Sequence, residues 1–431
     1  MKTLFKDVVY LDGFMDQATR GDLLVSGKVI EKAGEVPGPN AKGAEIVKCE
    51  GRKALLPGFV NSHTHAAMTL LRGLGEERPL KEWLEERIWP VEACLTAEDI
   101  GLGTVSAILE MAKTGTTCFA DMYFQMQEVG HVALEAGMRC GLSRGIIGEN
   151  ENSLEDGLSL TEHFAGEDLI TVQLAPHAPY TVPLDFFKKV AKEASAQGVR
   201  IHTHFLEAPW ERGQLEDDLG LDPVSFLESS GVLDAPGAIL AHCVWLEPEE
   251  AAKLAGTSVT IAHTPASNLK LGSGIAPLAV FLEKGDSVSL GTDGAASNNR
   301  LDMWGEMRLA ALLGKGSIRD PLCCKAAEVL RMATFEGARA LGFDKCGRIQ
   351  EGWMADLVLV DLDQPHYIGW EPATLGQFLV YAGSSADILG TMVAGRWVYK
   401  DGTWPGIDAP KVIRRTAEAR DALRLRAQGR R

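Results

Sequence analysis

The sequence predicts an α/β protein: a parallel (β/α)8 barrel of the TIM type with a small β-sandwich domain built from both chain ends. Three observations lead to this prediction. Short, nearly unbroken apolar runs recur eight times in the middle of the chain, amphipathic segments separate them, and the two ends carry similar pairs of short alternating strands. Parallel strands that are buried on both faces have this continuous apolar character, and their alternation with helices is typical of a barrel.

The β unit takes strands from both ends of the sequence. Glycine turns in LLVSGKVIEKAGEV (23–36) and TMVAGRWVYKDGTW (391–404) predict hairpins, and 44–58 and 347–363 add further strands. We expect residues 1–57 to form the N-terminal part of the sandwich, 58–346 the barrel, 347–410 the C-terminal part, and 411–431 a C-terminal helix.

Eight barrel strands are expected between these ends. In chain order they lie at 54–65, 116–124, 138–146, 170–180, 200–207, 238–246, 258–265 and 286–295. The stretch LDFFKKVAKEASAQG (184–198) is typical of the segments between them, because its apolar residues follow helical spacing and a glycine ends it.

The composition narrows the classes of partner. The 431-residue chain has a net charge of −16, and an acidic surface repels phosphate backbones, so we expect no nucleic-acid partner. Eight cysteines without a CxxC pair favour reduced thiols and a cytoplasmic protein. The start, MKTLFKDVVYLDG, has no long apolar core, and no run approaches the roughly 18 apolar residues of a membrane span, so no membrane partner is expected.

Chemically useful side chains gather where the predicted strands end. Seven of the ten histidines lie in the eight predicted strands. The candidates at the strand ends are His63, His65, Asp121, Arg144, His177, His204, Glu207, His242, His263 and Asp293. Catalytic groups of a (β/α)8 barrel come from these C-terminal ends, so the pattern indicates an active site.

A metal site is the sharper interpretation of the histidine pairs. In an extended strand His63 and His65 share one face. Within HTHFLE, His204 lies nearer the mouth, whereas His202 lies one layer deeper and is expected to be a hydrogen-bonding core residue. Three imidazoles with the carboxylate of Asp293 suit a zinc-like ion. The alternatives are core histidines, and an Asx turn or helix N-cap for Asp293.

Several phrases then resemble a known superfamily. PGFVNSHTH, HTHFLE, AHCVWL and GTDGAASNN resemble, in barrel order, the metal and proton-transfer motifs of the amidohydrolases. Residues 63–92, 175–182 and 264–313 resemble the 5-methylthioadenosine/S-adenosylhomocysteine deaminases, and the resemblance covers nearly the whole chain. It implies hydrolytic deamination of free 5′-substituted adenosines to inosine analogues and ammonia, with adenosine and 5′-deoxyadenosine as further candidate substrates.

The resemblance also implies roles for individual residues. It implies one divalent metal per subunit, most simply Zn²⁺ with Fe²⁺ or another divalent ion as alternatives. The metal ligands it implies are His63, His65, His204 and Asp293. Asp293 would take a proton from the attacking water, Glu207 would protonate and contact the purine at N1, and His242 would stabilise the attacking oxygen. The predicted fourth strand, ITVQLAPHAPY, lacks the lysine that bridges two metals in one branch of the superfamily.

Substrate contacts are implied in the same way. Glu92 and His177 would hold the ribose hydroxyls, Trp83 would lie against the 5′ substituent, and Arg144 would face the carboxylate of S-adenosylhomocysteine. Their plain alternatives are a solvated charge for Glu92, a core aromatic for Trp83 and a surface arginine for Arg144. Ser153 stands where similar sequences carry a second arginine, so we expect a weaker preference for S-adenosylhomocysteine.

Other functions remain open at this point. The same site could serve another amidohydrolase deaminase or a chlorohydrolase acting on a different purine, a pterin or a triazine. The barrel could be a catalytically silent scaffold, although none of the expected ligands is missing. The basic tail 411–431 could bind nucleic acid, but its helical spacing favours a solvated or subunit-contacting helix in a homo-oligomer.

Overall fold

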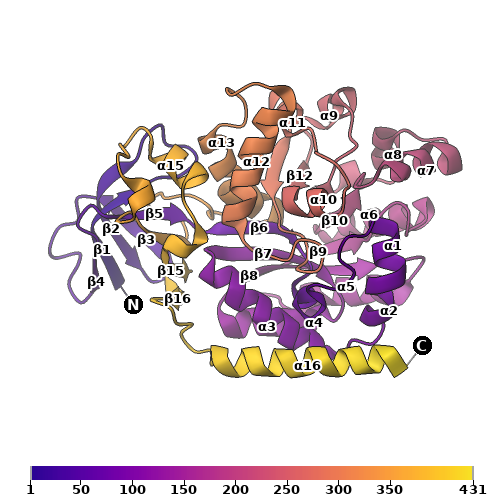
Figure 1. The fold of residues 1–431 in the computed structure, drawn as a ribbon, viewed down its shortest axis with the longest axis horizontal. Coiled ribbons are helices and arrows are strands. Elements are labelled where there is room, and N and C mark those ends of the chain that lie inside the picture. The colour runs from indigo at the N-terminus through magenta and orange to yellow at the C-terminus, as the bar shows by residue number, and fades with distance from the viewer. Residues whose placement is uncertain (1, 430–431) are drawn as a thin grey trace.

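The computed structural model describes residues 2–429, which form a barrel beside a smaller sheet (Figure 1). Eight parallel strands in chain order make the barrel, as predicted. These strands are β6 (Phe59–Thr64), β7 (Thr116–Tyr123), β8 (Arg139–Ile146), β9 (Ile170–Pro176), β10 (Arg200–Phe205), β11 (Ala238–His242), β12 (Val259–His263) and β13 (Ser287–Leu290). Every residue of β7 is buried, which explains why the barrel strands read as continuous apolar runs.

The barrel closes between its first and last strands through specific hydrogen bonds. The Ser62 hydroxyl donates to the Leu290 carbonyl at 2.7 Å and lies 2.8 Å from the Ser289 hydroxyl. At the mouth, the Asp293 N–H donates to the His63 carbonyl at 2.9 Å. Closure therefore brings Asp293 and His63, from opposite ends of the barrel sequence, to one place.

The smaller unit is built from both chain ends, as predicted, and its strands form one continuous mixed sheet in the order β16-β15-β14-β5-β1-β2-β3, with β4 beside β1. The strands are β1 (Lys2–Tyr10), β2 (Thr19–Ser26), β3 (Val29–Gly34), β4 (Glu45–Lys48), β5 (Lys53–Pro57), β14 (Leu357–Asp361), β15 (Ile388–Val393) and β16 (Arg396–Lys400). The two chain ends meet where β14 pairs antiparallel with β5.

The predicted strand at 54–65 divides at Gly58 between the two sheets. A Cβ at this position would lie 2.1 Å from the Thr117 hydroxyl oxygen, so only glycine fits. The Gly58 N–H donates to the Asp356 carbonyl at 2.8 Å. One residue thus links β5 of the small sheet to β6 of the barrel.

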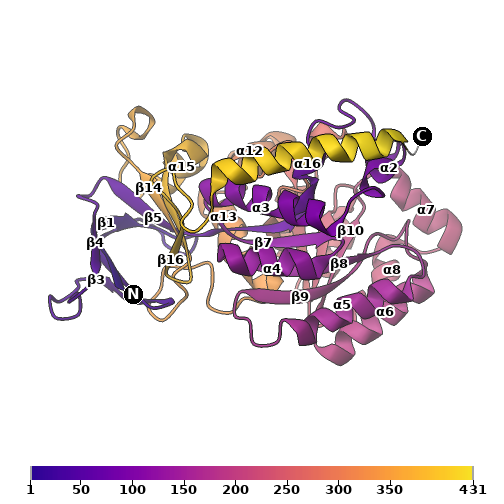
Figure 2. The same ribbon diagram turned by 90° about the horizontal axis from the view of Figure 1, so that it is seen from below.

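Helices cover the outside of the barrel (Figure 2). The helices of the barrel region are α3 (Ala97–Lys113), α4 (Met126–Ala136), α5 (Glu151–His163), α6 (Leu184–Gln197), α7 (Pro209–Leu219), α8 (Pro223–Ser229), α9 (Pro248–Leu254), α10 (Pro265–Lys270), α11 (Leu278–Lys284), α12 (Met303–Ile318), α13 (Ala326–Arg331) and α14 (Gly337–Leu341). Of these, α10 lies at the mouth, where Ser267 contacts Asp293. Shorter segments are η1 (Ala66–Leu71), α1 (Leu80–Trp83), η2 (Leu84–Ile88), α2 (Trp89–Glu92), η3 (Val232–Asp234), η4 (Met332–Glu336), η5 (Pro365–Tyr367), α15 (Leu375–Tyr381) and η6 (Ser385–Asp387).

The last helix, α16 (Ala409–Gly429), lies along α3 in both views (Figures 1 and 2). Arg415 pairs with Glu98 at 2.8 Å, and Arg426 pairs with Asp99 at 2.5 Å. The predicted helix at 411–431 is therefore present, and its last two residues lie outside the described ones. Within residues 2–429, no helix is both long and apolar enough to span a membrane.

A buried ion pair joins the barrel to the small sheet. Arg139 at the start of β8 donates to the Asp356 carboxylate at 2.6 Å, and the two side chains are only 2% and 3% exposed. We expect Asp356→Ala to lower the free energy of unfolding by about 3–5 kcal/mol, because it leaves the Arg139 guanidinium buried without a partner. Chemical denaturation measures this loss.

A second pair between the two units supplies the matched control. Lys28, in the turn after β2, pairs with Asp168, which precedes β9, but both side chains are about 60% exposed. Solvent screens such a pair, so Asp168→Ala should leave the denaturation midpoint unchanged. Equal losses in the two variants would show that burial does not set the contribution of the Arg139–Asp356 pair.

Candidate active site

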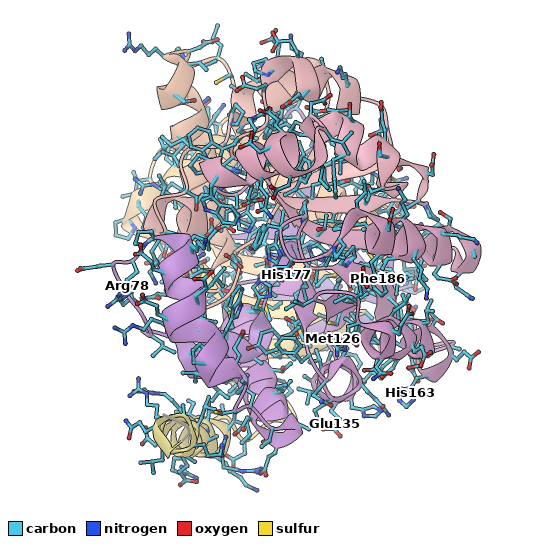
Figure 3. The ribbon with its side chains drawn as sticks, turned by 90° about the vertical axis from the view of Figure 1, so that its right-hand side faces the viewer. Arg78, Met126, Glu135, His163, His177 and Phe186 are labelled. Atoms are coloured by element: carbon cyan, nitrogen blue, oxygen red, sulfur yellow. The ribbon has the colours of Figure 1, made fainter. Side chains whose placement is uncertain are left out.

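A cavity opens at the C-terminal ends of the barrel strands, on the side away from the small sheet. Its floor is polar, and the residues there are His65, Glu92, Tyr123, His177, Tyr180, His204, Glu207, His242 and Asp293. Its walls are mainly apolar, and they include Met68, Leu80, Trp83, Leu84, Trp89, Phe124, Ile147 and Leu271. Figure 3 looks onto this side, where His177 lies near the middle of the ring of helices. Catalytic residues are expected in this position in a barrel.

Four expected metal ligands converge on the floor. The donor atoms of His63, His65 and Asp293 lie within 4.8 Å of one another. His65 Nε2 is 3.2 Å from Asp293 Oδ1 and 3.3 Å from His204 Nε2. His242 also belongs to a group with His63 and His204 whose donor atoms satisfy the same limit. These separations are those of ligands around one small cation.

The hydrogen bonds at the other ring nitrogens direct the Nε2 lone pairs toward this point. His65 Nδ1 lies 2.5 Å from the Met122 carbonyl, and His204 Nδ1 lies 2.8 Å from the His177 carbonyl. A carbonyl only accepts, so Nδ1 carries a proton in each ring, and each ring in its neutral form has its lone pair on Nε2. His63 Nε2 is buried and has no hydrogen-bond partner among the described residues. The donor set therefore fits a divalent metal ion.

The pKa values of the three histidines differ. Burial lowers the pKa of His63 to about 4 and moves the pKa of His204 well below its usual value, so both rings are neutral. His65 differs: burial would lower its pKa, but the Asp293 carboxylate outweighs burial and raises the pKa to about 9. His65 Nε2 lies 3.2 Å from Asp293 Oδ1, which explains why the carboxylate affects the pKa of this ring most among the charged groups.

Asp293 is held as a carboxylate. Burial alone would raise its pKa, but the imidazoles of His63 and His65 hold the pKa well below its usual value. Ser267 and Ser297 donate to Oδ2 at 2.5 and 2.7 Å, which fixes the orientation of the carboxylate. An ionised, oriented carboxylate can accept a proton from water bound beside it.

Glu207 has the opposite character. It is 4% exposed, and burial followed by the charge of Asp293 raises the pKa of Glu207 to about 8. Its Oε2 lies 3.6 Å from His242 Nε2, and Ser273 donates to its Oε1 at 3.4 Å. At neutral pH, the raised pKa of Glu207 favours its protonated form, whereas the lowered pKa of Asp293 favours its carboxylate. Two carboxyl groups held in opposite states can act as acid and base.

A tight turn after β10 positions Glu207. Leu206 adopts a left-handed backbone with φ of 50°, which is uncommon for a residue other than glycine. The N–H groups of Glu207 and Ala208 both donate to Glu211 Oε1, at 3.0 and 2.9 Å. Glu211 therefore holds the turn in the conformation that directs Glu207 at the cavity.

Three of the expected substrate contacts also line the cavity. The indole N–H of Trp83 donates to the Leu74 carbonyl at 3.1 Å, so the ring presents apolar surface to the cavity. Glu92 accepts a 2.6 Å hydrogen bond from the Tyr123 hydroxyl. His177 Nδ1 lies 2.9 Å from the Thr181 hydroxyl. Trp83 thus contributes apolar surface to the cavity, whereas Glu92 and His177 contribute polar groups.

Arg144 does not line the cavity. Ser143 and Gly145 face the barrel interior, so the pleat of β8 turns Arg144 outward against Gly157 of α5. Its guanidinium lies 3.0 Å from the Ser153 hydroxyl and 3.6 Å from the Asp156 carboxylate. The cavity lining contains no lysine or arginine among the described residues. Asp121 and His263, also expected at strand ends, are likewise absent from the lining.

Several residues of the site carried no clear sequence signal. Tyr123, Tyr180, Ser267, Ser273 and Ser297 occur in phrases noted for other residues, such as PASNLKLGSG, but serines and tyrosines are common in loops. His202 lies below the floor, where its ring nitrogens contact His63 and Ser143. These side chains can be identified as part of the site only from the folded structure, in which different segments of the chain meet.

Comparison with known proteins gives a consistent result. The sequence profile of the amidohydrolase family matches residues 54–398. A 5-methylthioadenosine/S-adenosylhomocysteine deaminase from Dictyoglomus thermophilum is 45% identical over 367 residues, covering 84% of this chain and 85% of the relative. A 5′-deoxyadenosine deaminase from Methanococcoides burtonii is 41% identical over 396 residues, covering 90% of this chain and 89% of the relative.

A solved structure matches the whole fold. An adenosine deaminase from Xanthomonas campestris with bound zinc superposes with a TM-score of 0.91, covers 98% of both chains and is 32% identical. The similarity thus extends over the barrel and over the sheet built from the chain ends.

Proposed function

This chain belongs to the amidohydrolase family and is a hydrolytic deaminase, and we propose that it removes the 6-amino group of free 5′-substituted adenosines. The products are the inosine analogue and ammonia. We propose 5-methylthioadenosine as the preferred substrate, ahead of S-adenosylhomocysteine, with adenosine and 5′-deoxyadenosine as further substrates. The observation that carries this proposal is one cavity that combines convergent ligands, a protonated Glu207 and an ionised Asp293 beneath apolar walls.

The metal assignment is part of the proposal. His63, His65, His204 and Asp293 would hold one divalent ion per chain, with zinc first and Fe²⁺ as the alternative. Such an ion, when bound, acts as a Lewis acid that brings the pKa of water toward neutrality. The segment ITVQLAP of β9 contains no lysine that could bridge a second ion, which supports a single-metal site.

The protein side chains would supply the proton transfers. Asp293 accepts a proton from water while the oxygen of that water forms a bond to C6 of the purine. Glu207 donates its proton to N1, so that the ring accepts the electron pair. His242, 3.6 Å from Glu207, stabilises the attacking oxygen. Return of a proton to the amino group breaks the C6–N bond and releases ammonia.

Substrate orientation would come from the cavity walls. Glu92 and His177, which line the cavity, would accept or donate at the ribose hydroxyls, and Trp83 with its apolar neighbours would surround the 5′ substituent. An apolar wall gives a methylthio group a favourable environment but offers no partner to a charged one. The lining therefore supports neutral 5′ substituents.

The position of Arg144 leads to a prediction about selectivity. We expect kcat/KM for 5-methylthioadenosine to exceed that for S-adenosylhomocysteine by a factor of about 5 to 150, because a carboxylate without a charged partner loses about 1–3 kcal/mol. Steady-state kinetics on the two substrates measures the ratio. A ratio near one, or a preference for S-adenosylhomocysteine, would contradict the prediction.

Arg144→Met tests whether the Arg144 guanidinium points toward the substrate or toward α5. Since the guanidinium faces α5 and Asp156, the substitution should change KM for both substrates alike. An increase in KM confined to S-adenosylhomocysteine would show that Arg144 turns toward the substrate carboxylate, as the sequence resemblance implies.

The proposal as a whole is tested by substrate scope. Purified protein with measured metal content should deaminate 5′-modified adenosines, which a fall in absorbance near the adenine band follows directly. Turnover of guanine, a pterin or a chlorotriazine, with none of any adenosine, would favour the alternative amidohydrolase reactions. No turnover of any of them at full metal content would favour the silent scaffold.

We further propose that the protein is cytoplasmic and does not bind nucleic acid. Eight free cysteines, seven of them buried, support a cytoplasmic location. Ion pairs between α16 and α3 occupy part of the basic face of the tail, which argues against nucleic-acid binding and is tested by gel shift. We also propose a homo-oligomer, which light scattering would test, and the domain limits at 57, 346 and 410.

A further inference from the structure

A buried hydrogen-bond chain runs across the barrel interior beneath the ligand cluster. His63 Nδ1 lies 2.8 Å from His202 Nε2, His202 Nδ1 lies 3.1 Å from the Ser143 hydroxyl, and that hydroxyl donates to Gln173 Oε1 at 2.7 Å. The four side chains come from four strands, β6, β10, β8 and β9, and each is 0% exposed. Bulk solvent therefore does not reach these hydrogen bonds.

His63 differs from the other two histidine ligands in the partner of its Nδ1. Backbone carbonyls hold His65 and His204, and a carbonyl can only accept. The partner of His63 is another imidazole, whose nitrogen can donate or accept. The lone pair on His63 Nε2 is therefore fixed only if something fixes the tautomer of His202.

Gln173, at the end of the hydrogen-bond chain away from His63, determines which atom donates in each hydrogen bond. The Gln173 carbonyl oxygen accepts from Ser143, so the Ser143 oxygen accepts from His202 Nδ1, and His202 Nε2 accepts from His63 Nδ1. His63 Nε2 is then left with its lone pair. The Gln173 amide nitrogen is buried without a partner among the described residues, so the oxygen alone anchors this amide. With the amide turned, every bond would reverse, and His63 Nε2 would carry a proton toward Asp293 Oδ1, 3.5 Å away.

We propose that Gln173, Ser143 and His202 form a positioning network that sets metal affinity by holding the Nε2 lone pair of His63 toward the metal. The inference rests on the proposed metal site. None of the three touches the metal, and they act through His63 alone. Removing a hydrogen-bond partner of a metal ligand typically lowers metal affinity by about 10–100-fold.

The test measures metal affinity in the intact protein without substrate. Zn²⁺ affinity is obtained by competition with a chromophoric chelator, for the parent and for Ser143→Ala. We expect binding to weaken, by at most the roughly 10–100-fold that loss of a ligand's own hydrogen-bond partner causes, because Ser143 acts on His63 through His202. The Co²⁺-loaded variant at saturation should keep the absorption spectrum of the parent, because the ligands are unchanged. A different Co²⁺ spectrum would mean that the substitution altered the ligand set, and it would overturn the positioning role.

Two further variants complete the design. Ser289→Ala is the matched control, because Ser289 is an equally buried hydroxyl of a barrel strand that bonds Ser62 and lies outside the network. It should leave Zn²⁺ affinity unchanged. Gln173→Met keeps the size of the side chain and removes the anchor, so it should weaken Zn²⁺ binding as Ser143→Ala does. It decides the question alone if Ser143→Ala does not fold.

The outcomes are distinguishable. Parental Zn²⁺ affinity in both network variants would overturn this inference and leave the deaminase proposal intact. Equal weakening in Ser289→Ala would also overturn it, because the loss would then reflect general damage to the core. A parent that binds no divalent metal would overturn the metal assignment in the proposed function together with this inference.

Discussion

Glu207→Gln should retain its metal and lose deaminase turnover by about 10²–10⁴-fold, the usual contribution of a general acid. Glutamine keeps the shape of the side chain and can still accept from Ser273, but it has no proton to give to N1 of the purine. Steady-state turnover of 5-methylthioadenosine, with metal content measured on the same sample, checks both halves of this expectation. Turnover within a few-fold of the parent would mean that Glu207 is not the acid.

Glu211→Gln is the matched control. Glu211 is 3% exposed, lies four residues further along the chain, and burial raises its pKa to about 8 as well. Its role is to accept two backbone N–H groups, which an amide oxygen can also do. Turnover should therefore remain close to that of the parent. A loss as large as that of Glu207→Gln would indicate that the geometry of the turn, rather than the acid, limits the reaction.

If Glu207 is the general acid, its pKa determines how kcat changes with pH. Burial raises the pKa of Glu207 to about 8, with the Asp293 carboxylate adding to the shift and Ser273 and His65 opposing it. The protonated form is present below this pKa, so kcat should fall as pH rises through it. The residual rate of Glu207→Gln should lack this alkaline decrease, since the amide does not titrate in that range.

Removal of the metal should abolish turnover, and one equivalent of Zn²⁺ per chain should restore it. A bound divalent ion contributes several kcal/mol of charge stabilisation and a reactive water, so we expect a loss of at least about 10³-fold. Dialysis against a chelator, elemental analysis and stepwise Zn²⁺ addition measure the effect. Two ions per active chain would contradict the single-metal site, and full activity without metal would remove the metal from the reaction.

Substitution of two different histidines tests whether the loss of metal and turnover comes from the ligand site. His204→Asn removes an expected ligand and should lower both metal content and turnover. His263 is also a buried histidine at the end of a barrel strand, but it does not line the cavity. His263→Asn should therefore retain metal. Loss of metal in both variants would show that folding of this side of the barrel, and not ligation, controls metal content.

The eight barrel strands were predictable because burial on both faces leaves continuous apolar runs that contrast with the amphipathic helices. His63, His65, His204, Glu207 and Asp293 were accessible for a related reason. In a (β/α)8 barrel every strand ends at the same mouth, so residues far apart in sequence can be assigned to one site without knowing any distance.

Features that depend on the direction of a side chain were not predictable. The direction of the Arg144 side chain is one such feature, because the pleat of β8 alternates its faces and only the structure shows that Ser143 faces inward. The division of the segment 54–65 at Gly58 was hidden because apolar residues continue on both sides. The network of Gln173, Ser143 and His202 joins three strands, and none of its members has a motif of its own.

The pairing of β5 with β14 also constrains how the chain acquires its structure. This pairing joins Pro57 to Leu357 across the whole length of the barrel sequence. At about 5–20 residues per second, a ribosome needs roughly tens of seconds to make the second strand after the first. During that time β5 has an open edge, and such edges are prone to unwanted pairing. The barrel can therefore be completed before its neighbouring sheet, and high contact order makes that final pairing a slow, late step of folding.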